Sequence, residues 1–162
     1  MTAKTLSIDP LKCTGCEDCV RACALKHGGK DNPARSRIHI IQGDTYSGFF
    51  LPVTCQQCEN APCLSVCPNK AIWRDDKLNR VMIRPDLCVG CQMCVSACPF
   101  GVMAFNRDRG IAFKCDLCDG TPECVRVCEP KALDYVDADR LNDQRLQESA
   151  LRHNQAMRLA AM

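Results

Sequence analysis

The chain has few aromatic residues and no long apolar run, and each absence excludes a class of protein. Phenylalanine, tyrosine and tryptophan make up only 5% of the 162 residues, which is little for a hydrophobic core that must hold a fold unaided. The longest apolar stretches, such as 102–105, have about four residues, whereas a membrane span needs about 20. We therefore expect no membrane span, and we expect another interaction to stabilise the fold.

Motifs for nucleic-acid binding and for catalysis are also missing. There is no basic run and no basic patch with interleaved aromatics, no dinucleotide or phosphate-binding loop, and no nucleophile beside a base. His27, His39 and His153 have no ligand or catalytic spacing. Residues 1–10 have no apolar core, cleavage site or twin arginine. We expect a cytoplasmic protein that binds no nucleic acid and catalyses no reaction alone.

Cysteine, by contrast, is abundant, and the 16 thiols fall into four groups of four. The groups are Cys13, Cys16, Cys19, Cys23; Cys55, Cys58, Cys63, Cys67; Cys88, Cys91, Cys94, Cys98; and Cys115, Cys118, Cys124, Cys128. Groups one and three have the C-x2-C-x2-C-x3-C spacing of bacterial ferredoxins, and the other two lengthen one gap. This pattern predicts four [4Fe–4S] clusters and an electron-carrying protein.

A disulfide scaffold and a zinc-binding structural protein are the alternative interpretations of these cysteines. Disulfides are rare in the reducing cytoplasm that we expect for this chain. Structural zinc sites use two C-x2-C pairs separated by a dozen or more residues, whereas each group here spans only 11 to 14 residues. The spacing favours iron–sulfur clusters. Because ligand binding also contributes folding free energy, we expect the apoprotein to be largely unfolded.

The segments around the ligand groups predict an α+β fold. A short apolar stretch before the last cysteine of groups two to four indicates one or two helical turns, which a following proline ends. Residues 71–74 with 80–83, and 103–105 with 111–113, predict β-hairpins. The connection 24–54 predicts a strand at 37–41, a turn at Gly43–Asp44 and a return at 49–51. The tail after Asp139 predicts a loosely amphipathic helix.

Each ligand loop has a geometry that links it to a second loop. Two-residue gaps allow three thiolates to reach three corners of one cluster, whereas the fourth cysteine starts a helical turn and points to a neighbouring cluster. Two groups therefore interlock around two clusters. Gly15 and Gly90 allow the backbone to approach closely.

Five lysines lie beside the ligands in the sequence: Lys12, Lys26, Lys70, Lys114 and Lys131. The formal net charge of +2 counts each cysteine as a neutral thiol, and thiolate-bound clusters make the protein negative. The lysines either soften that field and raise cluster potentials, or are ordinary solvated side chains.

The four cysteine groups resemble those of the four-cluster iron–sulfur electron-transfer subunits that serve molybdenum, tungsten and nickel enzymes. The resemblance covers about residues 5–137 and includes the longer gap in group two and the long first connection. The short chain and added C-terminal helix are most similar to the small iron–sulfur subunit of tungsten aldehyde oxidoreductase. The resemblance implies a tandem bacterial-ferredoxin-like fold of two interlocked dicluster modules with short helices, β-hairpins and a C-terminal helix.

The resemblance also implies domain boundaries and ligand sets. Residues 1–138 would form the four-cluster domain, with one module from 5–30 and 110–138 and another from 50–109, and residues 139–162 would form a docking helix. The implied sets are Cys13, Cys16, Cys19, Cys128; Cys23, Cys115, Cys118, Cys124; Cys55, Cys58, Cys63, Cys98; and Cys67, Cys88, Cys91, Cys94. Glu129 departs from the family pattern because the usual proline is displaced to Pro130.

We therefore expect an electron-transfer subunit that is not catalytic alone. It would relay electrons between a catalytic subunit with a molybdenum or tungsten cofactor, or nickel, such as aldehyde oxidoreductase, and a further redox subunit of flavin or ferredoxin type. Clusters in line plus a projecting helix would also permit end-to-end self-association. A free-standing polyferredoxin is the alternative function.

Overall fold

A computed structural model describes residues 4–43 and 48–160. The predicted turn at Gly43–Asp44 lies partly outside this range, as do the ends of the predicted domains. The helices are α1 (Asp18–Gly28), α2 (Pro62–Ser65), α3 (Met93–Ser96), α4 (Glu123–Arg126) and α5 (Ala138–Ala160). The strands are β1 (Lys4–Ile8), β2 (Ile38–Gln42), β3 (Phe50–Thr54), β4 (Ile72–Asp75), β5 (Arg80–Ile83), β6 (Ala104–Asn106), β7 (Ile111–Phe113) and β8 (Leu133–Asp137).

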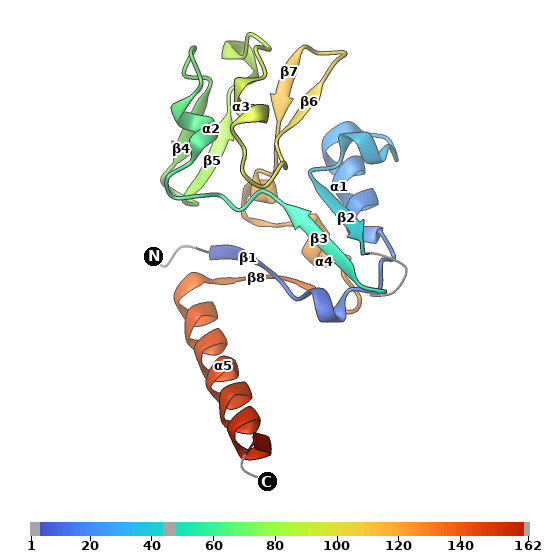
Figure 1. The fold of residues 1–162 in the computed structure, drawn as a ribbon. Coiled ribbons are helices and arrows are strands. Elements are labelled where there is room, and N and C mark those ends of the chain that lie inside the picture. The colour runs from blue at the N-terminus through green and yellow to red at the C-terminus, as the bar shows by residue number, and fades with distance from the viewer. Residues whose placement is uncertain (1–3, 44–47, 161–162) are drawn as a thin grey trace.

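The strands form four antiparallel pairs (Figure 1). Three pairs, β2–β3, β4–β5 and β6–β7, join strands that are consecutive along the chain. The two hairpins predicted between the ligand groups are confirmed, with Trp73 opposite Met82 in one and Phe105 opposite Ala112 in the other. The fourth pair, β1–β8, joins the two ends of the domain and was not predicted.

The helices of the domain are short and end beside ligand cysteines. Each of α2, α3 and α4 has four residues and ends two residues before the last cysteine of its group. This confirms the predicted helical turns. Helix α1 is longer because it continues through Cys23 to Gly28. The next residue, Gly29, has a left-handed conformation (φ 66°), and its N–H bonds the Leu25 carbonyl and ends the helix.

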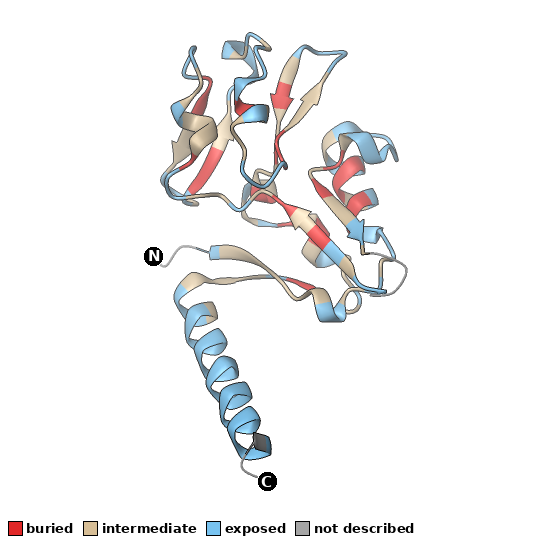
Figure 2. Ribbon diagram, viewed as in Figure 1, coloured by how far each residue is buried: buried red, intermediate tan, exposed pale blue. Residues whose placement is uncertain are grey.

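Two separate small cores hold the domain, and cysteines contribute to both. One core contains Cys19, Val20, Cys23, Ile38, Cys124 and Leu133. The other contains Ala61, Ile72, Val81, Cys94, Met103 and Ala112. Buried residues are scattered in short stretches over many elements (Figure 2). Each core draws mainly on one predicted module, although the module boundaries themselves remain a prediction.

The C-terminal helix α5 extends away from the domain (Figures 1 and 2). Its main contacts with the rest of the chain are with β1 and β8 near its first residues. Apolar side chains along it are exposed, with Leu146 at 72% and Leu159 at 75%. The predicted helix is therefore confirmed, and its apolar residues have no core to pack against within the described chain.

Strand β2 offers a matched pair of substitutions that tests the first core. Ile38 is 2% exposed, whereas Ile41 on the same strand is 53% exposed. We expect Ile38→Ala to destabilise the holoprotein by about 2–5 kcal/mol because it leaves a cavity, and Ile41→Ala by no more than about 0.5 kcal/mol. Thermal unfolding of both holoproteins at one scan rate measures the difference. Equal midpoints would show that Ile38 does not contribute to the core.

Candidate iron–sulfur sites

Three cavities in the domain are each lined by four cysteines. In every case three cysteines come from one ligand group and the fourth comes from another group. The sets are Cys13, Cys16, Cys19 and Cys128; Cys55, Cys58, Cys63 and Cys98; and Cys67, Cys88, Cys91 and Cys94. These sets have the same members as three of those that the family resemblance implies.

The remaining four cysteines also lie close together. Burial raises the pKa of the Cys124 thiol, and the charges of Cys115, Cys23 and Cys118 raise it further. The pKa of Cys118 is raised by burial, by Asp116 and by Cys23. Cys23 comes from α1, far away in the sequence, so this set also combines two ligand groups. The three cavities thus account for 12 of the 16 cysteines, and the remaining four influence one another electrostatically.

Backbone N–H groups point at several of the sulfurs. The Arg37 N–H donates to Cys23 Sγ at 3.2 Å, the Ala71 N–H to Cys67 Sγ at 3.3 Å, and the Leu117 N–H to Cys115 Sγ at 3.4 Å. Such donors stabilise a thiolate more than a neutral thiol. Two of these donors belong to connecting segments outside the ligand loops, which the cysteine spacing alone could not reveal.

A left-handed backbone residue follows the first cysteine of every group by two positions. These residues are Gly15, Gln57, Gly90 and Leu117, with φ values of 74°, 50°, 70° and 58°. The conformation curls each loop around its cavity. Glycine adopts it without strain, whereas Gln57 and Leu117 have Cβ atoms that make it costly by about 1–2 kcal/mol. Packing and hydrogen bonds must hold these two residues in place.

The thiols suit a group that binds as thiolates. Burial, followed by neighbouring thiols, raises the pKa of Cys19 to about 12 and that of Cys94 to about 11. Without a metal these thiols are neutral at pH 7, and metal binding must displace their protons. Four cysteine sulfurs per cavity, drawn from ferredoxin-type loops, are the donor set of a [4Fe–4S] cluster. The residues therefore fit the cofactor.

The four sets form a continuous row. Burial and the cysteines of its own set raise the pKa of Cys124 most, and Cys19 of the neighbouring set raises it further. In the same way Cys55 raises the pKa of Cys115, which burial brings to about 11. Cys63 likewise adds to the raised pKa of Cys94, after burial and the cysteines of its own set. Each of these pairs joins neighbouring sets, so the sets follow one another from Cys13 to Cys91.

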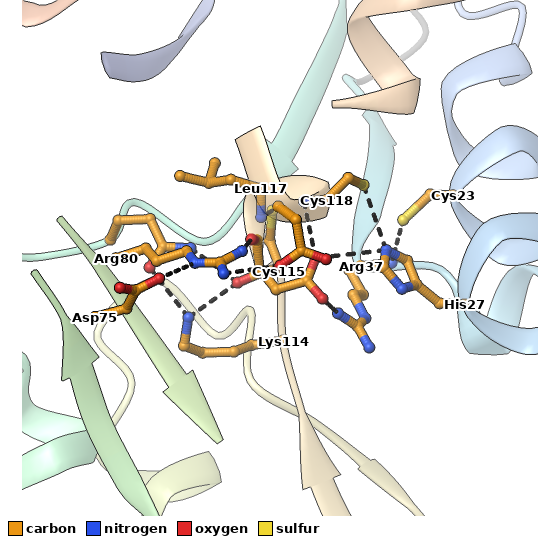
Figure 3. A network of polar contacts seen from close by, with 12 residues as sticks. Cys23, His27, Arg37, Asp75, Arg80, Lys114, Cys115, Leu117 and Cys118 are labelled. Atoms are coloured by element: carbon orange, nitrogen blue, oxygen red, sulfur yellow. Dashed lines mark hydrogen bonds and ion pairs between the residues drawn. The ribbon is translucent and has the colours of Figure 1, made fainter. Parts of the chain in front are cut away.

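Charged side chains lie between the two inner sets of the row, which are the set that contains Cys118 and the set that contains Cys63 (Figure 3). Burial alone would raise the pKa of the Asp116 carboxyl, but Arg37, 2.5 Å away, holds it below its usual value. His27 Nε2 lies 3.5 Å from Cys118 Sγ, and burial and the Arg37 charge lower the His27 pKa, which keeps the ring neutral. Neither His27 nor Arg37 has a spacing in the sequence that indicates this position.

Arg80 and Lys114 complete this charged region. Arg80 donates to Asp75 at 2.9 Å, to Asp119 at 2.8 Å and to the Asp116 carbonyl. Burial raises the pKa of the Cys63 thiol, and the nearby Lys114 charge opposes that rise. Lys114 is one of the five lysines that lie beside ligands in the sequence, whereas Arg80, on β5, carries no sequence signal other than its charge.

The fold and the four cysteine sets define an iron–sulfur protein of ferredoxin type. Two family profiles, each described as "4Fe-4S dicluster domain", match residues 46–138 and 12–72. The chain belongs to this family of 4Fe–4S dicluster proteins, and it carries electrons through its clusters. No helix within residues 4–43 and 48–160 is long and apolar enough to cross a membrane.

Related proteins include subunits of several oxidoreductases. The polyferredoxin-like subunit of aliphatic sulfonate oxidoreductase from Pyrococcus furiosus is 38% identical over 129 residues, which are 80% of this chain and 73% of that protein. The thiosulfate reductase electron transfer subunit PhsB of Salmonella typhi is 37% identical over 149 residues, covering 85% and 77%. A solved chain of the active site complex BamBC of benzoyl coenzyme A reductase, with 1,5-dienoyl-CoA, has a TM-score of 0.50 at 28% identity and covers 84% and 76%.

Two glycines with the same backbone conformation test how tightly the ligand loops are packed. A Cβ at Gly90 (φ 70°) would lie 2.6 Å from the Gly110 carbonyl oxygen, whereas a Cβ at Gly101 (φ 63°) would meet nothing within 4 Å. Both alanine variants carry the strain of a left-handed backbone. A difference in stability or iron content between them therefore measures the effect of the steric clash at position 90. We expect Gly90→Ala to purify with less iron than Gly101→Ala. Equal iron content and equal thermal midpoints would contradict this account.

Proposed function

We propose that each cysteine set holds one [4Fe–4S] cluster. The ligand sets would be Cys13, Cys16, Cys19, Cys128; Cys23, Cys115, Cys118, Cys124; Cys55, Cys58, Cys63, Cys98; and Cys67, Cys88, Cys91, Cys94. The shared cavities and the N–H groups that point at the sulfurs support these assignments. When bound, each cluster supplies a one-electron redox centre. The chain would hold it through four thiolates and direct backbone N–H groups at some of the sulfurs.

Pairs of cysteine substitutions test which thiols share a cluster. Removing Cys13 and Cys128 together should cost only one cluster, or about four irons, because both belong to one proposed set. Removing Cys13 and Cys98 together should cost about eight irons, because they belong to different sets. Iron analysis of anoxically purified Cys13→Ala/Cys128→Ala and Cys13→Ala/Cys98→Ala measures the difference. Equal losses in the two double variants would reject the assigned sets.

We further propose that this chain is the iron–sulfur subunit of an oxidoreductase complex. The observation that carries the proposal is the continuous row of four cysteine sets, because such a row suits transfer of electrons from one end of a protein to the other. The relatives named for aliphatic sulfonate oxidoreductase and thiosulfate reductase are themselves subunits of larger enzymes. The two partners would be a catalytic subunit with a molybdenum or tungsten cofactor, or nickel, and a redox subunit of flavin or ferredoxin type.

The C-terminal helix is the proposed docking element. It exposes Leu146, Leu151, Met157 and Leu159 and contacts the domain mainly at β1 and β8. Exposed apolar residues on a projecting helix favour insertion into a groove of another protein. That protein would be the catalytic subunit, or a second copy of this chain in end-to-end self-association. Because the 16 thiols must stay reduced, the cytoplasm is the proposed location.

Anoxic affinity purification from the native host, through an N-terminal tag, tests the subunit proposal. We expect a stoichiometric large subunit that contains tungsten, molybdenum or nickel. Deletion of residues 140–162 should abolish its recovery while the variant keeps its visible absorption and iron, because α5 contributes no cysteine. Recovery of the intact chain alone, with about sixteen irons, would instead identify a free-standing polyferredoxin. Unchanged recovery by the truncated chain would reject α5 as the docking element.

A further inference from the structure

Lys114 differs from the other four lysines that lie beside ligands in the sequence. Its side chain is buried, with only 4% of the residue exposed, whereas Lys12, Lys26, Lys70 and Lys131 are exposed. It follows β7 directly and precedes the ligand Cys115. The sequence could not distinguish between these five residues. The structure separates one buried ammonium group from four solvated ones.

The contacts of the Lys114 ammonium are neutral. Its Nζ donates to the Cys115 carbonyl at 2.9 Å and to Gln57 Oε1 at 3.2 Å. None of the ion pairs found among residues 4–43 and 48–160 joins Lys114 to a carboxylate. Burying a charge without an opposite charge is costly. Something else at this place must supply the negative charge.

Gln57 fixes the ammonium between two cysteine sets. Its Oε1 also accepts from the Val81 N–H at 2.8 Å, and its Nε2 donates to the Cys115 carbonyl at 2.8 Å. Gln57 lies in the loop between Cys55 and Cys58, while Cys115 belongs to the neighbouring set. The left-handed φ of 50° at Gln57 is thus held by hydrogen bonds at both ends of the amide. Figure 3 shows Lys114 below Cys115 with its dashed contacts.

Cysteines that would bind a cluster as thiolates offer negative charge at this place. Lys114 lines the same cavity as Cys55, Cys58, Cys63 and Cys98. A [4Fe–4S] group bound there by four thiolates carries a net negative charge, and one added electron makes it more negative by one unit. A fixed positive charge in a buried site attracts that added electron strongly, because little water screens it. Nearby charge is one of the levers that set cluster potentials.

We propose that Lys114, held by Gln57, raises the reduction potential of the cluster bound by Cys55, Cys58, Cys63 and Cys98. This inference rests on the proposed ligand sets. Lys114 binds no iron and acts only through the position of its charge. The transfer adds one electron from a neighbouring centre or an external reductant and needs no proton. The effect favours residence of the electron inside the row, away from the exposed Cys16 and Cys91 at its two ends.

Substitutions at position 114 separate the charge from the packing. In Lys114→Gln and Lys114→Met the ammonium is lost, in Lys114→Arg the charge stays, and Lys70→Met removes an exposed lysine as the matched control. Redox titration of each holoprotein with dithionite, followed by electron paramagnetic resonance, measures the four potentials. In Lys114→Gln and Lys114→Met we expect the reduction potential of one centre to fall by at least about 59 mV. That shift is a tenfold change in the equilibrium constant for one electron. Lys114→Arg and Lys70→Met should retain all four potentials.

A variant at a second residue tests the inference if Lys114 variants lose iron. Gln57→Glu places a carboxylate beside the ammonium and should shift the same centre in the same direction. That centre should be the one whose signal disappears in Cys98→Ala. Unchanged potentials in iron-replete Lys114→Gln or in Gln57→Glu would overturn the inference and leave the proposed function intact. A wild-type protein without about sixteen irons would overturn the proposed function, and the inference with it.

Discussion

The path of this chain is governed by the requirement that four thiols meet at each site although they come from distant segments. Cys128 lies beside Cys13 only because β8 runs antiparallel to β1, and Cys23 reaches Cys124 only because α1 packs on α4. The same cysteines form part of both small cores. Cluster ligation and side-chain burial therefore stabilise this domain together. This explains how the fold is stable with so few aromatic residues.

The centre of the row is distinguished from its ends by charge. Arg37 with Asp116, Arg80 with Asp75 and Asp119, and the lone ammonium of Lys114 lie between the two inner sets. At the ends, Cys16 and Cys91 are exposed. Water screens charges near the ends, whereas the inner sets experience fixed side-chain charges at low screening. One scaffold of repeated loops thus provides sites of different electrostatic character.

Several local features were predictable from the sequence because each depends on neighbouring residues. Proline after Cys67 and Cys98, alternating strands around polar turns, and the change in composition after Asp139 predicted helical turns, hairpins and the last helix. Gln57 and Arg80 were missed, since neither residue type nor spacing indicates that Gln57 would hydrogen-bond Cys115 or that Arg80 would hydrogen-bond Asp116. His27 was assigned no role for the same reason. Its ring reaches Cys118 across 91 positions of sequence.

The sequence by itself determined the number of ligand groups, the ferredoxin-type spacing within each group and the short elements between them. These follow from local geometry, because three thiols in one curled loop can reach one site without help from the rest of the chain. Only the tertiary structure decided which lysine is buried and where α5 projects. Those properties depend on contacts between segments far apart in sequence, and a buried Lys114 differs from an exposed Lys70 only through what packs around it.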